Sequence, residues 1–501
     1  MDMAEKKDYV QLVCDAAGSS YETTKKEMER IRELSGITYR EYYIYKLYKL
    51  SETQRSIEAR RIVLRKEHRK ERYDKVSAAT NLSEKQIREN IRVINQEYGV
   101  KMNIIPYQKY EIYGYEGEAL EEFLALFAER NRLKDQLSEC FNKIDNKELT
   151  YADTAADLER FYDIIEKIMP ESLCAELMQQ IGHFCPEITE NSALARKVAV
   201  DMEATRVLLG FTAEEYGTLH FEHKSIEEKR NFFSEKERFQ VINKLNDQSK
   251  TDLLDDKYEA YRLLGKYYGR RMIKVSSEDD YKNFRSICRR GSKIVVKPFS
   301  GTMGKGIKSV DIRWWTDIRK LFQSLLDEYN VFVVEEFIRA HSSLKALNPD
   351  SVNTVRILTY ADGDKKLIHD PTIKIGQKGS FVDNAGSGGI LAYVDMKTGR
   401  ILGDGCDGKG ARYKEHPHTG IRFDGYQMPD WNKAVRLGLE LADKVPGLKY
   451  IGWDITYTED GKWIVVEGNS RPQVYGPQCA AGAGIRKYFI KTIGYRPDNN
   501  N

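Results

Sequence analysis

The sequence has few of the residues that would indicate a secreted, zinc-stabilised or membrane-spanning protein. Its 501 residues include seven cysteines, and no two of them form a CxxC pair. Scattered cysteines in odd number predict reduced thiols in a cytoplasmic protein and no structural zinc site. The longest apolar stretches are strand-sized, far short of the roughly 18 residues that a membrane span requires. The first ten residues also lack the apolar core of a signal peptide.

Neither sign of charge dominates the sequence. There are 80 basic and 77 acidic side chains, which gives a formal net charge of +3. This near-balance gives no reason to expect nucleic acid as a partner. Residues 60–72 (RRIVLRKEHRKER) are nevertheless strongly basic. They indicate either a solvated helix face or, as the alternative, a surface for an anionic partner or a membrane.

Glycine and proline are scarce before about residue 245, and that part of the chain is predicted to be helical. Apolar residues recur there at helical spacing, as in Leu120, Phe123, Leu124 and Phe127. We therefore expect a helical N-terminal region over residues 1–150 and a further helical segment over residues 151–245. This segment leads into a domain of different composition over residues 246–495.

Three helix starts are marked by capping boxes, in which a Ser or Thr caps the helix and a Glu or Gln reaches back to it. The first and third are each preceded by a glycine, Gly36 and Gly210, and followed by a serine, Ser51 and Ser225. This spacing indicates either a duplicated helical unit or two independent capping boxes. The boxes are Thr38 with Glu41, Ser83 with Gln86, and Thr212 with Glu215.

After about residue 245, short apolar runs alternate with turns rich in Gly and Asp. This pattern predicts a mixed α/β or α+β domain built on hairpins. Helices are still expected near residues 257–269, 279–290, 315–328 and 431–445.

A glycine-rich loop joins two of the expected strands. Residues 293–311 (KIVVKPFSGTMGKGIKSVD) contain an apolar strand, the loop SGTMGKG over residues 300–306, and a second strand. Glycines let backbone amides approach an anion closely, and Lys297 and Lys305 add positive charge, so a triphosphate is the expected ligand. The alternative is an ordinary glycine-rich hairpin turn. The spacing does not fit a P-loop, which is followed by a helix.

A second glycine pattern carries no such prediction. Residues 403–408 (GDGCDG) match GxGxxG letter for letter, but they continue into Lys409-Gly410-Ala411-Arg412 rather than a helix. The dinucleotide-binding fingerprint requires that helix.

Residues 450–469 (YIGWDITYTEDGKWIVVEGN) predict a β-hairpin with Asp460-Gly461 as its two-residue loop. With that loop, the opposing pairs are Thr458 with Trp463, Ile455 with Val466, Asp454 with Glu467, and Gly452 with Asn469. One face then carries the apolar side chains of Trp453, Ile455, Tyr457, Ile464 and Val466, which we expect in the core.

The opposite face of this hairpin carries Asp454, Glu467 and Asn469 together. Like charges directly opposite on neighbouring strands are destabilising, so a divalent cation is expected between them. Their oxygens suit Mg²⁺, which takes few protein ligands together with phosphate oxygens, and Mn²⁺ is a second candidate. The alternative is a solvated acidic edge.

Taken in order, these segments resemble the ATP-grasp superfamily. The resemblance implies a C-terminal ATP-grasp fold, in which two α/β lobes clasp ATP, within an α+β chain that begins with a mostly helical region. Asp256-Lys257 opens the match, Lys297 resembles the strand lysine on the phosphates, and residues 454, 467 and 469 resemble the metal ligands. The flexible lid is represented by Ser300, Gly301, Thr302, Gly304, Lys305 and Gly306, and the adenine-binding hinge by Glu335, Glu336, Phe337 and Ile338.

The sequence is most similar to the sugar-transfer-associated ATP-grasp family, which is related to α-L-glutamate ligases. Three segments carry this likeness: residues 351–356 (SVNTVR), residues 382–389 (VDNAGSGG) and residues 416–420 (HPHTG). The resemblance covers roughly residues 205–495. It implies substrate contacts from Asn353, Asn384, Gly388, Gly389, His416 and His418. For the two histidines, local hydrogen bonding is a second option, and metal binding is less favoured because no further ligand cluster is visible in the sequence.

The family chemistry implied by this resemblance is a Mg-ATP-dependent ligation. A carboxylate attacks the γ-phosphate to give an acyl phosphate, and an amine or other nucleophile then displaces phosphate, forming a C–N bond in the amine case. Arg356 and Lys374 would steady the phosphates or the acyl phosphate, and Arg471 would bind the acceptor carboxylate or the transferring phosphoryl group. The alternatives are surface charges for the first two and a turn-bracing arginine for the third.

The hinge departs from the family pattern, because Arg339-Ala340-His341-Ser342 follow where relatives place an acidic ribose-binding residue. Glu336 and His341 are the remaining candidates for that contact. Two other functions remain open on this fold: a kinase or phosphotransferase, and a non-catalytic ATP-binding module with a protein partner for the helical region. The family's association suggests a small-molecule or glycan-linked carboxylate in cell-surface polysaccharide assembly.

Overall fold

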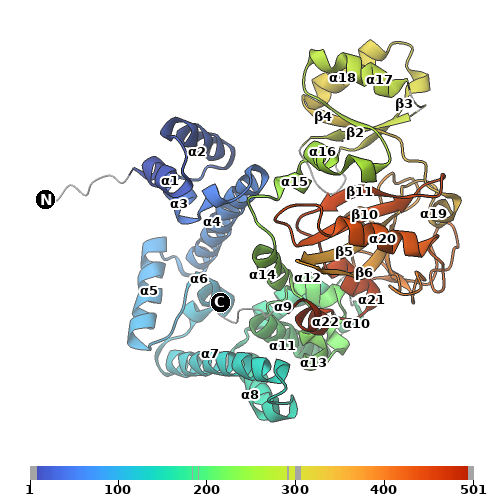
Figure 1. The fold of residues 1–501 in the computed structure, drawn as a ribbon. Helices are drawn as coiled ribbons and strands as arrows, with labels where there is room; N and C mark the ends of the chain where they lie inside the picture. Colours follow the sequence, from blue (N-terminus) through green and yellow to red (C-terminus); the bar gives the residue numbers. More distant parts are fainter. Residues whose placement is uncertain are drawn as a thin grey trace. The chain divides into compact units, whose positions relative to one another are not determined.

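The structure is a computed structural model that describes residues 8–494, except 183, 185, 190, 290, 292 and 300–305 (Figure 1). The chain divides between residues 230 and 231 into two compact units. The first is helical, and the second contains two β-sheets with the helices that cover them. The predicted α+β class, with a helical region ahead of the sheets, is confirmed. Among the described residues, no helix is both long enough and apolar enough to cross a bilayer.

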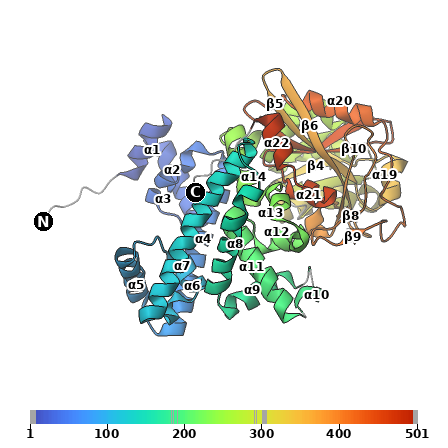
Figure 2. The same ribbon diagram turned by 90° about the horizontal axis from the view of Figure 1, so that it is seen from below.

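The helices of the first unit are joined by short connections and 3₁₀ turns (Figures 1 and 2). The 3₁₀ turns are η1 (Leu47–Lys49), η2 (Ile112–Gly114), η3 (Ala152–Thr154) and η4 (Phe221–His223). The α-helices are α1 (Tyr9–Ala17), α2 (Tyr21–Ser35), α3 (Tyr39–Ile44), α4 (Glu52–Thr80), α5 (Glu84–Glu97), α6 (Ile104–Lys109), α7 (Gly117–Asp145), α8 (Ala155–Ile168), α9 (Glu171–Ile181), α10 (Pro186–Thr189), α11 (Ser192–Leu209), α12 (Ala213–Thr218) and α13 (Ile226–Arg230).

All three predicted capping boxes are present, at the starts of α3, α5 and α12. At the first of them, the amide of Glu41 donates to the hydroxyl of Thr38 at 3.2 Å, and the amide of Thr38 donates to the carboxylate of Glu41 at 2.9 Å. These bonds satisfy N–H groups that the first turn of a helix leaves without a partner. The positions of these starts are therefore set by local sequence.

Among the described residues of the first unit, one local arrangement occurs three times. A six-residue helix (α3, α6 or α12) is followed by a residue with positive φ, then by a three-residue 3₁₀ turn (η1, η2 or η4), and then by the next helix. The positive-φ residues, Lys46, Glu111 and His220, each lie seven positions after the start of their helix. The fourth residue of each short helix is a buried tyrosine: Tyr42, Tyr107 and Tyr216.

The three tyrosines share a hydrogen-bonding role. Each tyrosine hydroxyl forms a hydrogen bond with a polar side chain of the preceding helix. That partner residue lies nine positions before a glycine that has a positive φ. The tyrosine partners are Glu27 on α2, Asn90 on α5 and Asp201 on α11, and the glycines are Gly36, Gly99 and Gly210. The recurrence therefore includes the helix before each short helix, and we call each copy a repeat.

The second unit contains an antiparallel four-stranded sheet in the order β1-β4-β2-β3 and an antiparallel seven-stranded sheet in the order β11-β10-β5-β6-β7-β8-β9. The first sheet comprises β1 (Met272–Val275), β2 (Lys293–Pro298), β3 (Lys308–Asp311) and β4 (Phe332–Glu336). The second comprises β5 (Thr354–Asp362), β6 (Lys365–Ile375), β7 (Ile390–Tyr393), β8 (Gly405–Cys406), β9 (Arg412–Tyr413), β10 (Tyr450–Tyr457) and β11 (Trp463–Asn469).

Helices cover both sheets, and the four predicted helices correspond to α16, α17, α18 and α20. The other helices of this unit are short or near its ends. In chain order the set is α14 (Glu235–Leu245), α15 (Asp252–Asp255), α16 (Lys257–Tyr268), η5 (Glu278–Asp280), α17 (Tyr281–Cys288), η6 (Ile312–Trp314), α18 (Ile318–Tyr329), α19 (Ser342–Leu347), η7 (Ala385–Ser387), α20 (Trp431–Leu441), α21 (Tyr475–Ala481) and α22 (Arg486–Ile493).

The cores follow the alternation of side chains along the strands. Phe284 of α17 and Phe322 of α18 pack on the four-stranded sheet (Figure 1). On β5, Ile357 packs on the side of α20, whereas Leu358 joins the core that includes residues of α14 and α22. Successive strand residues point to opposite faces, so both faces of the larger sheet are covered by apolar packing.

The loop of the β10–β11 hairpin is one residue longer than predicted. Residues 459–461 form it, and the amide of Thr458 donates to the carbonyl of Lys462 at 2.9 Å. Gly461 takes a positive φ of 76°, as is usual in three-residue hairpin loops. The prediction that Thr458 pairs with Trp463 is therefore wrong.

A β-bulge further along the hairpin restores the predicted register. Ile455 pairs with Val465 and not with Val466, and the register shifts between Asp454 and Ile455. Val465 is fully buried in the core, so the expectation that Val466 occupies the core is also wrong. Beyond the bulge the predicted pairs are present: Asp454 with Glu467, and Gly452 with Asn469.

Candidate active site

The second unit contains a cavity of about 440 Å³ between strands of its two sheets. Residues from β2, β4, β5, β6, β10 and β11 line it, together with the loop that follows β6. The cavity brings together most of the predicted site residues from widely separated parts of the sequence. These are Lys257, Lys297, Glu335, Glu336, Phe337, Ile338, Arg356, Lys374, Asn384, Asp454, Glu467, Asn469 and Arg471.

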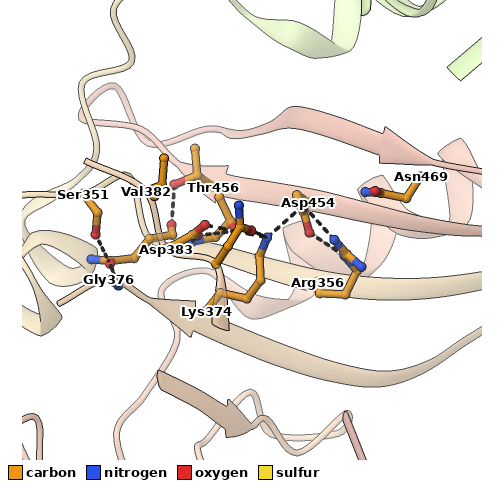
Figure 3. Close-up of polar contacts among 12 residues, drawn as sticks. Ser351, Arg356, Lys374, Gly376, Val382, Asp383, Asp454, Thr456 and Asn469 are labelled. Carbon is orange, nitrogen blue, oxygen red and sulfur yellow. Dashed lines mark hydrogen bonds and ion pairs between the residues drawn. The ribbon is translucent and has the colours of Figure 1, made fainter. Parts of the chain in front are cut away.

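Asp454 lies at the centre of a buried charge cluster (Figure 3). Arg356, its cross-strand neighbour on β5, donates from Nε to Oδ1 at 2.5 Å and from Nη2 to Oδ2 at 2.9 Å. Lys374 on β6 donates from Nζ to Oδ2 at 2.9 Å. Burial alone would raise the pKa of Asp454, but the attraction of Arg356 and Lys374 lowers it below the ordinary value. This carboxylate is therefore held ionised.

Asp383 is a second carboxylate of this cluster. It accepts hydrogen bonds from the amide and hydroxyl of Thr354 at 2.9 and 2.6 Å, and it lies 3.7 Å from Nζ of Lys374. Burial raises the pKa of Asp383, and Lys374 offsets only part of this effect. For Lys374, burial favours loss of the proton, but Asp383 and Asp454 outweigh it and raise the pKa. The lysine is thus a cation between two carboxylates.

The predicted cation ligands sit beside this cluster. Glu467 faces Asp454 across the bulged hairpin and is solvent-exposed, whereas Asn469 is half-buried. The amide nitrogen of Asn469 donates to the carbonyl of Gly452 at 3.5 Å, so its oxygen is the atom that can serve a cation. Among the described residues, no three His, Cys, Asp or Glu side chains converge as a self-sufficient metal site.

This donor set fits Mg²⁺ that shares its coordination with phosphates. It offers two carboxylates and one amide oxygen, and Mg²⁺ characteristically takes few protein ligands and completes its shell with phosphate and water. Because Asp454 is already paired with Arg356 and Lys374, the like charges of Asp454 and Glu467 are tolerated without a metal. A metal ligated by Asp454 has to compete with those two cations.

On the four-stranded sheet, Lys297 is held by a buried glutamate. Its Nζ lies 2.5 Å from Oε1 of Glu335, and Nε of Arg270 donates to Oε2 at 2.8 Å. Burial alone would raise the pKa of Glu335, but Arg270 and Lys297 lower it. The side chain of Glu335 therefore orients Lys297 at the cavity.

The hinge residues line the same end of the cavity. The carboxylate of Glu336 accepts from the amide of Arg271 at 2.8 Å, and the Phe337 ring lies 6.2 Å from that of Phe381. Lys257, which lines the cavity as well, is the first residue of α16, and Asp256 caps that helix. This end therefore combines an apolar wall with a cation.

A family model described as sugar-transfer associated ATP-grasp matches residues 236–494, just over half of the chain. The chain belongs to the sugar-transfer associated ATP-grasp family. Its second unit has the ATP-grasp fold. A comparison with curated proteins found no match.

The ATP-grasp unit is also similar to solved structures. An L-amino acid ligase from Bacillus licheniformis is 13% identical with a TM-score of 0.30, and the match covers 46% of this chain and 44% of that one. An N5-carboxyaminoimidazole synthase from Aspergillus clavatus, solved with ADP and 5-aminoimidazole ribonucleotide, is 10% identical with a TM-score of 0.30, covering 46% and 48%.

A VanG D-Ala:D-Ser ligase from Enterococcus faecalis is 13% identical with a TM-score of 0.31, covering 49% of this chain and 63% of that one. The match therefore spans less than two thirds of each of these three proteins.

Most of the predicted lid of this ATP-grasp unit, Ser300, Gly301, Thr302, Gly304 and Lys305, lies outside the described residues. Gly306 is described, with a φ of 76°. Its carbonyl accepts from the hydroxyl of Tyr329 at 3.0 Å. A side chain at this position would lie 3.1 Å from the ring of Pro298, so this end of the lid requires a glycine.

Arg471 follows β11 and is one of the residues that line the cavity. Its Nη2 donates to the amide oxygen of Gln248 at 2.5 Å, and its own carbonyl accepts from Arg238 at 3.2 Å. These contacts fix the turn that follows Asn469. Both the bracing alternative and a role toward a ligand are compatible with this position.

Three predicted substrate residues have structural contacts outside the cavity lining. Asn353 is fully buried, and its amide nitrogen donates to the carbonyls of Leu344 and Asn348 at 2.7 and 2.9 Å. The amide of Gly389 donates to the carbonyl of Asn384 at 3.0 Å, and Gly388 has a φ of 85°. Asn353 therefore ties the start of β5 to the end of α19, and the two glycines shape the loop that carries Asp383 and Asn384. The contact of all three with substrate stays a prediction.

The two histidines also lie outside the cavity lining. His416 is fully buried, with its Nε2 at 2.9 Å from the carbonyl of Gly376 and its Nδ1 accepting from Thr419 at 3.3 Å. Burial lowers the pKa of His416. These contacts match the local hydrogen-bonding alternative for His416, whereas His418 is solvent-exposed. A substrate contact for either stays a prediction.

Sequence reasoning missed two charged residues of the site, Asp383 and Arg270. Asp383 belongs to a recognised glycine-rich segment, but its pairing with Lys374 depends on how that loop folds back on the sheet. Arg270 follows the end of α16, and besides binding Glu335 it donates to the carbonyl of Val465 at 2.7 Å. A pattern among neighbouring residues in the sequence does not predict contacts between residues so far apart.

Proposed function

We propose that this chain is a Mg-ATP-dependent ligase that activates a carboxylate as an acyl phosphate and transfers the acyl group to an amine. The observation that carries this proposal is the convergence of Arg356 and Lys374 on Asp454, in the cavity that also contains Lys297 and the hinge. A site with both acidic metal-type ligands and buried cations suits phosphoryl transfer, which depends mainly on positioning and on stabilisation of charge.

The nucleotide end of the site is assigned to the hinge and Lys297. Phe337 and Ile338 supply an apolar wall for the base, and the adjoining backbone of β4 supplies its polar edge. Lys297, held by Glu335, is positioned to neutralise phosphate oxygens. Glu336 lines this end and is the better placed of the two candidates for the ribose, because His341 is not among the lining residues.

Asp454, Glu467 and Asn469 are proposed to bind Mg²⁺, and Mn²⁺ is a second candidate for the same site. When bound, the metal supplies charge neutralisation to the nucleotide phosphates. The protein's part is to provide oxygen ligands on two adjacent strands and to fix their spacing by the bulge in the β10–β11 hairpin.

The reacting carboxylate is assigned to the end lined by Arg356, Lys374 and Arg471. Its oxygen forms a bond to the γ-phosphorus as the bond to the ADP oxygen breaks. The amine nitrogen then bonds to the acyl carbon, phosphate leaves, and the amine loses a proton. Arg356 and Lys374 are positioned to neutralise the oxygens of the transferred phosphoryl group in both steps.

The family's description supports a substrate linked to sugar transfer, such as a glycan-linked carboxylate in cell-surface polysaccharide modification. A kinase on the same fold would keep the same nucleotide site but transfer the phosphoryl group without releasing phosphate. In a purely regulatory ATP-binding module the carboxylate pair would have no chemical task.

The test is to incubate the protein with Mg-ATP and fractionated small metabolites, and to measure ADP and free phosphate together. Hydroxylamine, a strong amine nucleophile, is added in parallel to trap an acyl phosphate as a hydroxamate. Stoichiometric ADP, phosphate and hydroxamate in one fraction, all absent with Glu467→Gln, would support the ligase. ADP without phosphate would establish the kinase, and nucleotide binding with no turnover in any fraction would favour the module.

A further inference from the structure

The first two repeats of the helical unit can be compared residue by residue. The short helices begin at Tyr39 and Ile104, 65 positions apart, and the long helices α4 and α7 begin at Glu52 and Gly117, also 65 positions apart. Both long helices have 29 residues. From the short helix onward, each residue of the first repeat therefore has an equivalent 65 positions later.

In the second repeat, a glutamate from α11 fills a buried site. Tyr110 donates from its hydroxyl to Oε1 of Glu203 at 2.5 Å, and Lys109 donates to Oε2 at 2.6 Å. Arg130 of α7 donates to the hydroxyl of Tyr110 at 2.9 Å. The exposed fractions are 1% for Tyr110, 0% for Glu203 and 8% for Arg130.

The carboxylate in that site is charged. Burial alone would raise the pKa of Glu203, but Arg206 and Lys109 lower it to about 2. A buried carboxylate is stable only with such partners. Arg206 lies on α11 itself, so the second repeat contributes the hydroxyl of Tyr110 and the ammonium of Lys109, and Arg130 supports the tyrosine. The site accepts an α-helix that presents one anionic side chain among apolar ones.

The equivalent positions of the first repeat face solvent. Tyr45 corresponds to Tyr110 and is 50% exposed, Ile44 corresponds to Lys109 and is 51% exposed, and the side chain of Arg65, which corresponds to Arg130, is 65% exposed. An aromatic ring, an aliphatic side chain and a guanidinium are thus exposed at the three positions whose equivalents lie at α11 in the second repeat.

We propose that the surface formed by Ile44, Tyr45 and Arg65 docks an α-helix of a partner protein that presents a glutamate between apolar residues. Two observations select this occupant. The second repeat binds such a helix with Tyr110, supported by Arg130, and these two residues are the equivalents of Tyr45 and Arg65. In addition, Arg65 lies in the basic run of residues 60–72 on α4, which complements an acidic side chain. This proposal does not depend on the proposed function.

The experiment uses α11 itself as the probe, because its sequence is known to suit the equivalent site. A labelled peptide of residues 192–209 is pre-formed as a helix by a cross-link that replaces Ala193 and Lys197, which are exposed and one turn apart. Its binding to the full chain is followed by fluorescence anisotropy. A second peptide carries Glu203→Gln.

Three variants of the protein locate the binding. Tyr45→Ala and Arg65→Glu alter the proposed surface, and Lys70→Glu makes the same charge change on α4 at about 140° around the helix from Arg65. All three positions are exposed, so the fold should persist, which circular dichroism would check.

The expected result is saturable binding of the α11 peptide that falls at least about tenfold with Tyr45→Ala, with Arg65→Glu and with the Glu203→Gln peptide. That factor corresponds to the loss of about 1.4 kcal/mol. Lys70→Glu should bind like the wild type. Absence of saturable binding, or equal binding by Arg65→Glu, would overturn the proposal.

Two further measurements test other occupants. Sedimentation velocity that reveals a dimer dissociated by Arg65→Glu would replace the partner helix with a second copy of this chain and overturn the proposal. Binding to phosphatidylserine vesicles that is lost with Arg65→Glu, together with no binding of the peptide, would assign the surface to a membrane instead.

Discussion

Arg356 and Asp454 face each other across β5 and β10, and the guanidinium binds both oxygens of the carboxylate. Replacing Asp454 with Asn would leave Arg356 and Lys374 as buried cations with one counter-charge fewer. Breaking a buried ion pair from one side typically costs about 3–5 kcal/mol. We expect Asp454→Asn to lower the free energy of unfolding, measured by urea titration, by an amount in this range.

Glu467→Gln is the matched comparison for this substitution. Glu467 is solvent-exposed on the neighbouring strand, and exposed substitutions usually change stability by less than about 0.5 kcal/mol. If the two variants destabilise the protein equally, Asp454 is not the centre of the buried charge cluster.

Binding of a divalent cation is expected to depend on nucleotide. In the structure, Arg356 and Lys374 bind both oxygens of Asp454. Phosphates would offer these cations other anionic partners and leave the carboxylate to the metal. We expect Mn²⁺ to bind at least about tenfold more tightly in the presence of a non-hydrolysable ATP analogue, a coupling of about 1.4 kcal/mol.

Electron paramagnetic resonance titration of Mn²⁺ measures this coupling, after subtraction of the ion bound by free analogue. Glu467→Gln should weaken the nucleotide-dependent site. Tight Mn²⁺ binding without nucleotide would contradict the competition inferred from the ion pairs.

Lys297 should contribute to nucleotide affinity with little effect on stability. Arg270 remains bonded to Glu335 when Lys297 is replaced, so the buried carboxylate keeps a counter-charge. We expect Lys297→Gln to weaken ATP binding about tenfold or more, as removal of a charged hydrogen bond would. Isothermal titration calorimetry would measure it. Lys308→Gln, which removes an exposed lysine paired with Glu328, should leave the affinity unchanged.

The lowered pKa of His416 leads us to expect that one part of the free energy of unfolding depends on pH. Burial lowers its pKa in the folded state below the ordinary value of 6.5. Below about pH 6.5 the unfolded chain therefore binds a proton that the folded chain does not, so stability falls as the pH decreases. His416→Gln should reduce the slope of the free energy of unfolding between about pH 5 and 6.5. An unchanged slope would assign this dependence to other groups.

The parts of the fold that sequence predicted best depend on neighbouring residues. Capping boxes such as Thr38 with Glu41 specify a helix start within four residues, and they are present as expected. The second repeat was not recognised in the sequence because its short helix lacks a capping box. Asn103 caps α6, and Pro106 occupies the position where a capping box has a Glu or Gln. In addition, the segment between Gly99 and α6 is two residues longer than the segment between Gly36 and α3 in the first repeat. The second repeat is recognised as equivalent to the other two only by its backbone, with positive φ at Gly99 and Glu111, and by the hydrogen bond of Tyr107 to Asn90.

The site shows the same division between local and long-range information. Lys297 lies on β2 and the hinge residues lie at the end of β4 and just after it, and all of them line one cavity. The role of Asp383 was not predictable, because its contact with Lys374 is made by a loop that returns to the sheet. The acidic pair on β10 and β11 was placed correctly although two details of the hairpin were wrong, since the longer loop and the bulge compensate each other.

That compensation can be tested with Val465 and Val466, which exchange roles between the predicted and observed registers. Val465 is fully buried in the core, whereas Val466 is half-buried and lines the cavity. Removing two methyl groups from a packed core costs about 2 kcal/mol, so Val465→Ala should lower the free energy of unfolding by about that amount. Val466→Ala should cost less than about 1 kcal/mol and should instead change ATP affinity. The opposite ranking in urea unfolding would mean that the hairpin has the originally predicted register, with neither the longer loop nor the bulge.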